Sequence, residues 1–247
     1  MCGRYARSKD KAQLVEEFDV RQAPAEELSA DYNVAPTKQV YVVADRSGEA
    51  QGEAVRTLAI ARWGLVPSWA KDRSIGSRLI NARVESASSK PAFRSAWRRR
   101  RCLVPADGFY EWYEPTGADA VRGKSGKPLK QPFYIHPADG HSLAMAGLYE
   151  FWRDPEGEPA DPWLMSVTIL TTTATDSLGR IHDRMPLPLP PEAWAQWLDP
   201  ELSGDDAAGA LREHRAASLA AYPVARDVNS VRNNGPHLSE PLPAEAP

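Results

Sequence analysis

The stretch CLVPADGFYEWYE, residues 102–114, decides the fold class of this chain. Its β-branched and aromatic residues, interrupted by Pro, Asp and Gly, are typical of short strands separated by turns. If the GFYEWY portion is extended, Glu111 shares one face with Phe109 and Tyr113, because successive side chains alternate between faces. Desolvation among these rings would raise the pKa of Glu111 and suit it to proton transfer. A carboxylate at a strand edge, paired with an arginine, fits the pattern equally well.

Strand patterns of this kind dominate the middle of the chain. They recur in QVYVVA (residues 39–44), VRTLAIARW (55–63), PFYIH (132–136), SLAMAGLYEFW (142–152) and LMSVTILTTTA (164–174). Helical patterns occur in SKDKAQLVEEFDV (8–20), with Ser8 as the expected N-cap, in PLPLPPEAWAQWLD (186–199), and in DAAGALREHRAA (206–217), an expected surface helix. We therefore predict an α+β fold: a single domain with a mainly antiparallel, barrel-like central sheet flanked by helices.

The 247 residues are enough for one large hydrophobic core. The polar, glycine-rich segment PTGADAVRGKSGKPLKQ (residues 115–131) is typical of a long hairpin loop between two strands. We expect one domain over residues 1–235 and a proline-rich, disordered tail over residues 236–247.

Composition and charge exclude several classes of protein. The formal net charge is −3, so any nucleic-acid site must be a local basic patch. Two cysteines are too few for a disulfide framework, and we find neither a signal peptide nor an apolar run long enough to cross a membrane. We expect a cytoplasmic protein with a free thiol. The cysteines and histidines lack metal-ligand spacing, so we expect no metal and no cofactor.

Cys2 directly follows the initiator methionine. Methionine before a small residue is commonly removed, which would leave an amine and a thiol on one residue. The amine can condense with an aldehyde to a Schiff base, and the thiol can then close a thiazolidine ring. An internal cysteine cannot do this, because its nitrogen is an amide. A small buried hydrophobic residue is the alternative interpretation of Cys2.

Polar residues elsewhere offer partners for such chemistry. In LINARVES (residues 79–86), Asn81, Arg83 and Glu85 recur at a period of two and would share one face of a strand. Asn81 can orient a carbonyl or hydroxyl group, and Arg83 can bind a phosphate. The alternative interpretation is a solvent-exposed strand face without a function. In LGRIHDRMP (178–186), His182 is flanked by two charged residues and could complete an acid–base pair, or be a loop histidine.

Two segments could contact a nucleic acid. In ARWGLVPSWAKDR (residues 61–73), we expect Trp63 in the core and Trp69 exposed beside basic residues, as in a stacking platform for unpaired bases. The run RSAWRRRR (94–101) is the strongest basic cluster. Such runs are usually solvated faces, but this one could guide a nucleic-acid backbone.

Taken in order, seven motifs resemble the SOS-response-associated peptidase (SRAP) family, and the resemblance extends from Cys2 to VNSVRNNG (228–235). The motifs are MCGRY (1–5), YNVAPT (32–37), WGLVPSW (63–69), INARVES (80–86), PADGFYEWY (105–113), AGLYEFW (146–152) and IHDRMP (181–186). The resemblance implies a covalent reaction with abasic sites in single-stranded DNA, whose ring-opened sugar exposes an aldehyde. Cys2 would form a thiazolidine crosslink that shields the lesion during the DNA damage response. Removal of Met1 by autoproteolysis, a peptidase (hydrolase) activity, a lyase-like activity and crosslink reversal are implied as well.

The resemblance also implies roles for individual residues. Asn81 would position Cys2 and the sugar, Glu111 would transfer protons, and His182 would assist Schiff-base chemistry and reversal. The expected DNA-binding residues are Arg4, Arg83 and Arg184, which would hold phosphates, and Pro36 and Trp69, which would shape the groove.

Two other functions compete with this interpretation. Glutamine-type amidases also begin with Met-Cys-Gly, but no other motif of that class follows here. A single-strand binding module without chemistry is the non-enzymatic alternative. For the crosslinking function we expect a monomer near the nucleoid, with replication-fork proteins as candidate further partners.

Overall fold

The computed structural model describes residues 2–47, 54–115, 122–123, 126, 128–158, 161–174, 176–213 and 218–243. Its strands are β1 (Tyr5–Arg7), β2 (Asp31–Val34), β3 (Gln39–Ser47), β4 (Ala54–Trp63), β5 (Asn81–Arg83), β6 (Arg101–Ala106), β7 (Gly108–Tyr113), β8 (Gln131–Pro137), β9 (Leu143–Glu158), β10 (Asp161–Thr173), β11 (Arg184–Pro186) and β12 (Leu219–Pro223). Its α-helices are α1 (Lys11–Glu17), α2 (Val84–Ala87), α3 (Arg94–Arg99), α4 (Pro191–Leu198), α5 (Gly204–Ala207) and α6 (Ala210–Glu213). Short 3-10 helices are η1 (Arg73–Arg78), η2 (Asp176–Arg180), η3 (Arg226–Asn229) and η4 (Pro236–Ser239).

Five strands close into a barrel. The order is β10-β4-β3-β6-β9, and β9 pairs back with β10 to complete the ring. Within the ring, only the β10–β4 pairing is parallel. Strands β5 and β11 pair with the part of β10 that extends beyond β4. Side chains alternate as a barrel requires: Val40 and Val42 belong to the interior cluster, whereas Tyr41 and Val43 pack outside it. The predicted α+β domain with a mainly antiparallel, barrel-like sheet is confirmed.

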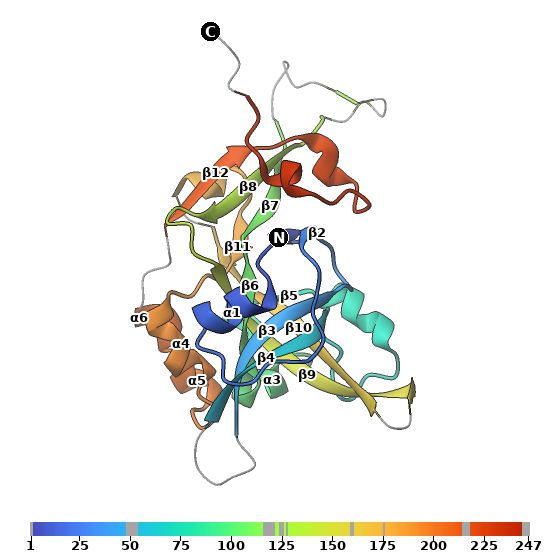
Figure 1. Cartoon of the computed structure of the whole chain (residues 1–247), viewed down its shortest axis with the longest axis vertical. Coiled ribbons are helices and arrows are strands. Elements are labelled where there is room, and N and C mark those ends of the chain that lie inside the picture. Colours follow the sequence, from blue (N-terminus) through green and yellow to red (C-terminus); the bar gives the residue numbers. More distant parts are fainter. Residues whose placement is uncertain are drawn as a thin grey trace.

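A second, five-stranded sheet has the order β12-β8-β7-β1-β2 and lies above the barrel in Figure 1. The stretch that decides the fold class links the two sheets, because β6 belongs to the barrel and β7 to the second sheet. Asp107 marks the crossing: its backbone N–H donates to the carbonyl of Ala6, and its carboxylate accepts from the backbone N–H of Ser8 at 2.5 Å. This linker therefore ties the chain start to the junction of the sheets.

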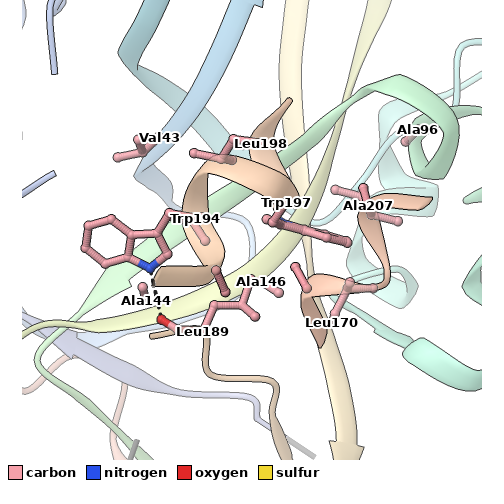
Figure 2. Close-up of a cluster of buried hydrophobic side chains, with 14 of the residues drawn as sticks. Val43, Ala96, Ala144, Ala146, Leu170, Leu189, Trp194, Trp197, Leu198 and Ala207 are labelled. Atoms are coloured by element: carbon pink, nitrogen blue, oxygen red, sulfur yellow. Dashed lines mark hydrogen bonds between the residues drawn. The ribbon is translucent and has the colours of Figure 1, made fainter. Parts of the chain in front are cut away.

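Helices cover the outer face of the barrel (Figure 1). In α4, Trp194 and Trp197 are buried at the predicted helical spacing, and Trp194 donates to the carbonyl of Leu189 at 2.9 Å (Figure 2). Trp194 also stacks on Phe18 from the end of α1, with ring centroids 4.6 Å apart. The N-cap of α1 is Asp10, not the expected Ser8, because Asp10 completes a capping box with Gln13.

The segments outside the core differ in part from expectation. Residues 206–213 do not form one surface helix: α5 and α6 are separate turns, and Ala207 and Ala210 are fully buried. Residues 115–131 join the antiparallel strands β7 and β8, as a hairpin loop does, although residues 116–121 lie outside the described part. Beyond residue 235, η4 buries Leu238, and residues 244–247 again lie outside the described part.

The basic run at residues 94–101 is not a uniform solvated face. Arg98 and Arg99 are exposed on α3, and Arg100 pairs with Glu150 at 2.7 Å. Arg101, in contrast, is buried and its guanidinium donates to five backbone carbonyls, those of Trp97, Arg98, Trp197, Asp199 and Leu202. This arginine satisfies the ends of α3 and α4, so it is unavailable to a nucleic-acid backbone.

We predict that Arg101→Met lowers the free energy of unfolding by about 3 kcal/mol or more, because several buried carbonyls lose their donor while the aliphatic volume is kept. Urea unfolding followed by circular dichroism measures the change. The control is Arg98→Met on the exposed face of α3, which should shift stability by no more than about 0.5 kcal/mol. Equal stability of the two variants would contradict the structural role of Arg101.

Candidate active site

The start of the chain is held inside the molecule. Strand β1 lies between β7 and β2, with Tyr5 opposite Phe109 on one side and Val34 on the other. This pairing carries Cys2 into the buried cluster that fills the barrel, where its side chain has no exposed surface. Burial alone would fit the alternative interpretation of Cys2 as a small hydrophobic residue. The polar groups around Cys2, described next, do not fit that interpretation.

Asn81 fixes the backbone of Cys2. Its side-chain Nδ2 donates to the carbonyl of Cys2 at 2.6 Å. Strand β5 places it there by pairing in parallel with β10, opposite Ile169. The Oδ1 atom of Asn81 is buried and accepts no hydrogen bond from the described residues. The side chain therefore anchors the chain start through one end and keeps an acceptor at the other.

Glu111 brings a titratable group to the same place. Its side chain is buried on the face of β7 that carries Phe109, as the alternation predicted. Burial raises the pKa of Glu111 above that of an ordinary glutamate, and the charge of His182 is among the effects that oppose the rise. The expected partner, an arginine at a strand edge, is not among these effects. Among the described side chains, His182 is the one whose charge acts on Glu111 in this direction.

The thiol of Cys2 is not a preformed thiolate. Burial raises its pKa, and the nearby carboxylate of Glu111 raises it further. Because the thiolate is the nucleophilic form of cysteine, a proton must leave Sγ when it reacts. A carboxylate with a raised pKa beside the thiol can accept that proton.

His182 lies between η2 and β11, and about a third of its side-chain surface is exposed. Its Nδ1 atom lies 3.0 Å from the backbone nitrogen of Arg184, which donates to it. The same Nδ1 atom lies 2.8 Å from Oδ1 of Asp183. A bare Nδ1 accepts from the backbone N–H, and an Nδ1 that carries a hydrogen donates to the Asp183 carboxylate, so the ring has a partner in either arrangement.

The three predicted phosphate-binding arginines differ in availability. Arg83 is exposed, and its side chain makes no hydrogen bond or ion pair with the described residues. Arg4 donates to Oδ1 of Asn33 at 2.6 Å and to the carbonyl of Val228 at 2.9 Å. Arg184 binds Glu85 in bidentate fashion, at 2.7 and 2.9 Å. Only Arg83 presents its guanidinium freely to solvent.

Glu85 does not lie where the sequence pattern placed it. We expected an extended segment with Asn81, Arg83 and Glu85 on one face. Instead β5 ends at Arg83, and α2 begins at the next residue. The turn brings Glu85 to Arg184, whose side chain is only 11% exposed. Releasing this arginine for a phosphate requires that Glu85 be displaced.

The segments that carry the expected groove residues Pro36 and Trp69 are joined by one backbone hydrogen bond. Trp63 is fully buried and Trp69 is 60% exposed, as predicted. Pro36 lies in the turn between β2 and β3, and the next residue, Thr37, donates its backbone N–H to the carbonyl of Trp63 at 2.8 Å. This hydrogen bond therefore ties the turn that contains Pro36 to the start of the loop that carries Trp69.

Tyr5 was overlooked as a site residue. Its ring packs against Trp63 with centroids 5.2 Å apart, and its buried hydroxyl makes no hydrogen bond with the described residues. Burial raises its pKa, and the charge of Cys2 contributes in the same direction. The signal available in the sequence was its place in MCGRY, three residues after Cys2.

Comparison with known proteins identifies the family of the chain. The family model of the SOS response associated peptidase (SRAP) matches residues 1–231. The chain belongs to the SRAP family. Curated relatives are the abasic site processing proteins YoqW of Bacillus subtilis, 37% identical over 97% of this chain and 99% of the relative, and YedK of Escherichia coli, 34% identical over 98% and 100%. A third, HMCES of Gallus gallus, is 31% identical over 100% of this chain and 80% of its own length.

Solved structures share the SRAP fold seen here. A crystal structure of a protein from Bacteroides thetaiotaomicron superposes with a TM-score of 0.77 at 25% identity, covering 98% of this chain and 100% of that one. Within the described residues, no group of three or more His, Cys, Asp or Glu is arranged to hold a metal ion. The described helices include none with the length and apolar character of a membrane span.

The raised pKa of Glu111 predicts how its replacement changes stability with pH. The unfolded chain ionises Glu111 at a lower pH than the folded protein does, so ionisation favours unfolding once the pH exceeds the ordinary glutamate value. Glu111→Gln should therefore raise the free energy of unfolding at pH 7. The gain should vanish as the pH falls to about 4, where both states are protonated.

Urea unfolding across this pH range measures the effect. Glu16→Gln on the exposed face of α1 is the matched control. A gain for Glu111→Gln that is absent, or that stays constant between pH 4 and 7, would contradict the burial of an ionisable Glu111.

Proposed function

We propose that this SRAP protein recognises abasic sites in single-stranded DNA and captures them as a covalent thiazolidine at Cys2. The observation that carries the proposal is the hydrogen bond from Asn81 to the carbonyl of the buried Cys2, together with the buried carboxyl group of Glu111, whose charge acts on the Cys2 thiol. The names of its relatives, which are abasic site processing proteins, support the same substrate.

The chemistry begins after Met1 is removed, by autoproteolysis or by an aminopeptidase. The free α-amine of Cys2 attacks the aldehyde of the ring-opened sugar, and loss of one water gives an imine. The thiol then adds its sulfur to the imine carbon, while its proton ends on the imine nitrogen. Both groups come from one residue, so the reacting atoms are held together without a further binding step.

Glu111 moves protons in both steps. Its raised pKa lets it donate a proton to the departing water and accept one from the neutral thiol of Cys2. Asn81 holds the carbonyl of Cys2 and offers its buried Oδ1 to a donor on the sugar, such as a hydroxyl. These roles require the site to act on a bound strand, because the thiol by itself is held in its unreactive form.

A strand would approach over the exposed residues. Arg83 is ready to bind a phosphate, and Trp69 offers an exposed ring on which an unpaired base can stack. Pro36 shapes the turn beside this loop. Arg4 and Arg184 complete the phosphate contacts, Arg184 by exchanging its Glu85 partner for a phosphate.

Cys2→Ala should abolish the stable adduct, because both the sulfur and the ring closure are lost. Cys2→Ser should form a reversible imine only, since a hydroxyl is the poorer nucleophile. A heat-denatured gel of protein mixed with an abasic single strand measures adduct yield, and hydrolysis of glutamine, assayed in parallel, separates the amidase alternative. Adduct formation by Cys2→Ala at the wild-type rate would exclude the thiazolidine.

Arg83→Ala should weaken noncovalent binding of a single strand and reduce the slope of log K against log salt by roughly 0.7, the share of one phosphate contact. The control is Arg21→Ala, an exposed arginine that pairs with Asp19 beyond α1. Fluorescence anisotropy over a salt series gives both slopes. If the Arg83→Ala slope equals that of the wild type, Arg83 does not contact the strand.

His182→Ala should still form the adduct, more slowly, and should release it much more slowly than the wild type. Reversal must protonate the departing sulfur and admit water, which needs a group that exchanges protons near neutral pH. A chase with excess abasic strand of a different length, followed by gel, measures the exchange. Exchange at the wild-type rate would leave His182 as a scaffold residue beside Asp183.

A further inference from the structure

An open cavity of about 440 Å³ lies beside the proposed reaction centre. It is lined by Tyr113, Phe133, Arg180, Ile181, and residues 219–221 of β12. Tyr113 and Ile181 belong to the motifs PADGFYEWY and IHDRMP, but none of the lining residues has a role in the chemistry above. The cavity is large enough for a planar ring system, and it is open on one side.

The floor of the cavity continues the strand face that carries Glu111. Tyr113 is two residues further along β7 and therefore points to the same side of the sheet. Phe133 on β8 lies directly opposite Glu111 in the antiparallel register, so the two side chains are neighbours on that face. The rings of Tyr113 and Phe133 meet edge to face, with centroids 6.4 Å apart and planes at 85°.

The other wall comes from the segment that carries His182. Arg180 ends η2, and Ile181 immediately precedes His182. Arg180 is the one charged residue among the described residues that line the cavity, and it is exposed. The cavity therefore combines aromatic and aliphatic surfaces with a single positive charge at its edge.

We infer that this cavity binds the base of the nucleotide next to the abasic site, with Arg180 at its phosphate; the inference rests on the proposed function. An abasic sugar has no base of its own, so the neighbouring base loses a stacking partner in the strand. A half-buried pair of aromatic rings replaces that partner, and stacking on protein rings tolerates any base. Because Phe133 is the direct neighbour of Glu111, an occupied cavity lies within one nucleotide of the lesion.

A base in this position would hold the sugar against Glu111 and His182 from the side opposite to β1. The lesion would be recognised by two features together, an aldehyde at Cys2 and a stacked base beside it. Undamaged strands offer the second feature without the first.

Binding of three short single strands tests the inference. Each carries a central tetrahydrofuran, an abasic analogue without an aldehyde, so that only noncovalent binding is measured. The first strand has bases on both sides, and the other two carry a second tetrahydrofuran on the 5′ or on the 3′ side. The wild type should lose about 5- to 100-fold in affinity when the base on one particular side is missing, and little when the other is missing.

Tyr113→Leu and Phe133→Leu remove the rings and keep apolar volume. Each should bind the strand that lacks the recognised base as well as the wild type does, which shows that the fold is intact. Each should also lose most of the preference for the strand that retains this base. Trp163→Ala, which removes an exposed tryptophan on β10, should keep the full preference.

Wild-type protein that binds all three strands alike would overturn the inference, as would leucine variants that keep the wild-type preference. Failure of the proposed function has a different signature. In that case the wild type forms no covalent adduct with a strand that carries an aldehydic abasic site, whatever its preference among the three analogues.

Discussion

The hydrogen bond from Asn81 to the carbonyl of Cys2 is the contact on which the site depends. A chain terminus normally frays, and a free terminus would make a poor reaction centre. Here β1 pairs with β2 on one side and with β7 on the other, and Asn81 holds Cys2, which lies just before β1. Strand β5 pairs with the barrel strand β10, and β1 belongs to the second sheet. The hydrogen bond from Asn81 to Cys2 therefore also joins the two sheets.

Burial governs the titration of the two groups at the site. Desolvation raises the pKa of Cys2 and that of Glu111, and the negative charge of Glu111 raises the pKa of Cys2 further. Arg83 and Trp69, in contrast to this buried pair, are exposed to solvent.

The sequence allowed the barrel and the helix containing Trp194 to be predicted, because both rest on local periodicity, and the family motifs singled out Cys2, Asn81 and Glu111 as candidate site residues. Contacts between distant segments were not accessible in this way. The crossing of residues 102–114 between two sheets depends on Asp107 pairing with residues near the chain start. The burial of Arg101 depends on carbonyls that α4 and its following turn bring to it. The pairing of Glu85 with Arg184 depends on β5 ending at Arg83, whereas the alternation of polar residues suggested a strand that continues to Glu85.

The intact mass of the purified protein, before and after incubation with an abasic single-stranded oligonucleotide, tests the central claim most directly. The account predicts a starting mass that lacks Met1. It also predicts a product heavier by the mass of the oligonucleotide minus one water, since imine formation expels one water and ring closure expels nothing. An adduct on protein that retains Met1, or no adduct on protein that has lost it, would contradict the capture of abasic DNA by an N-terminal Cys2.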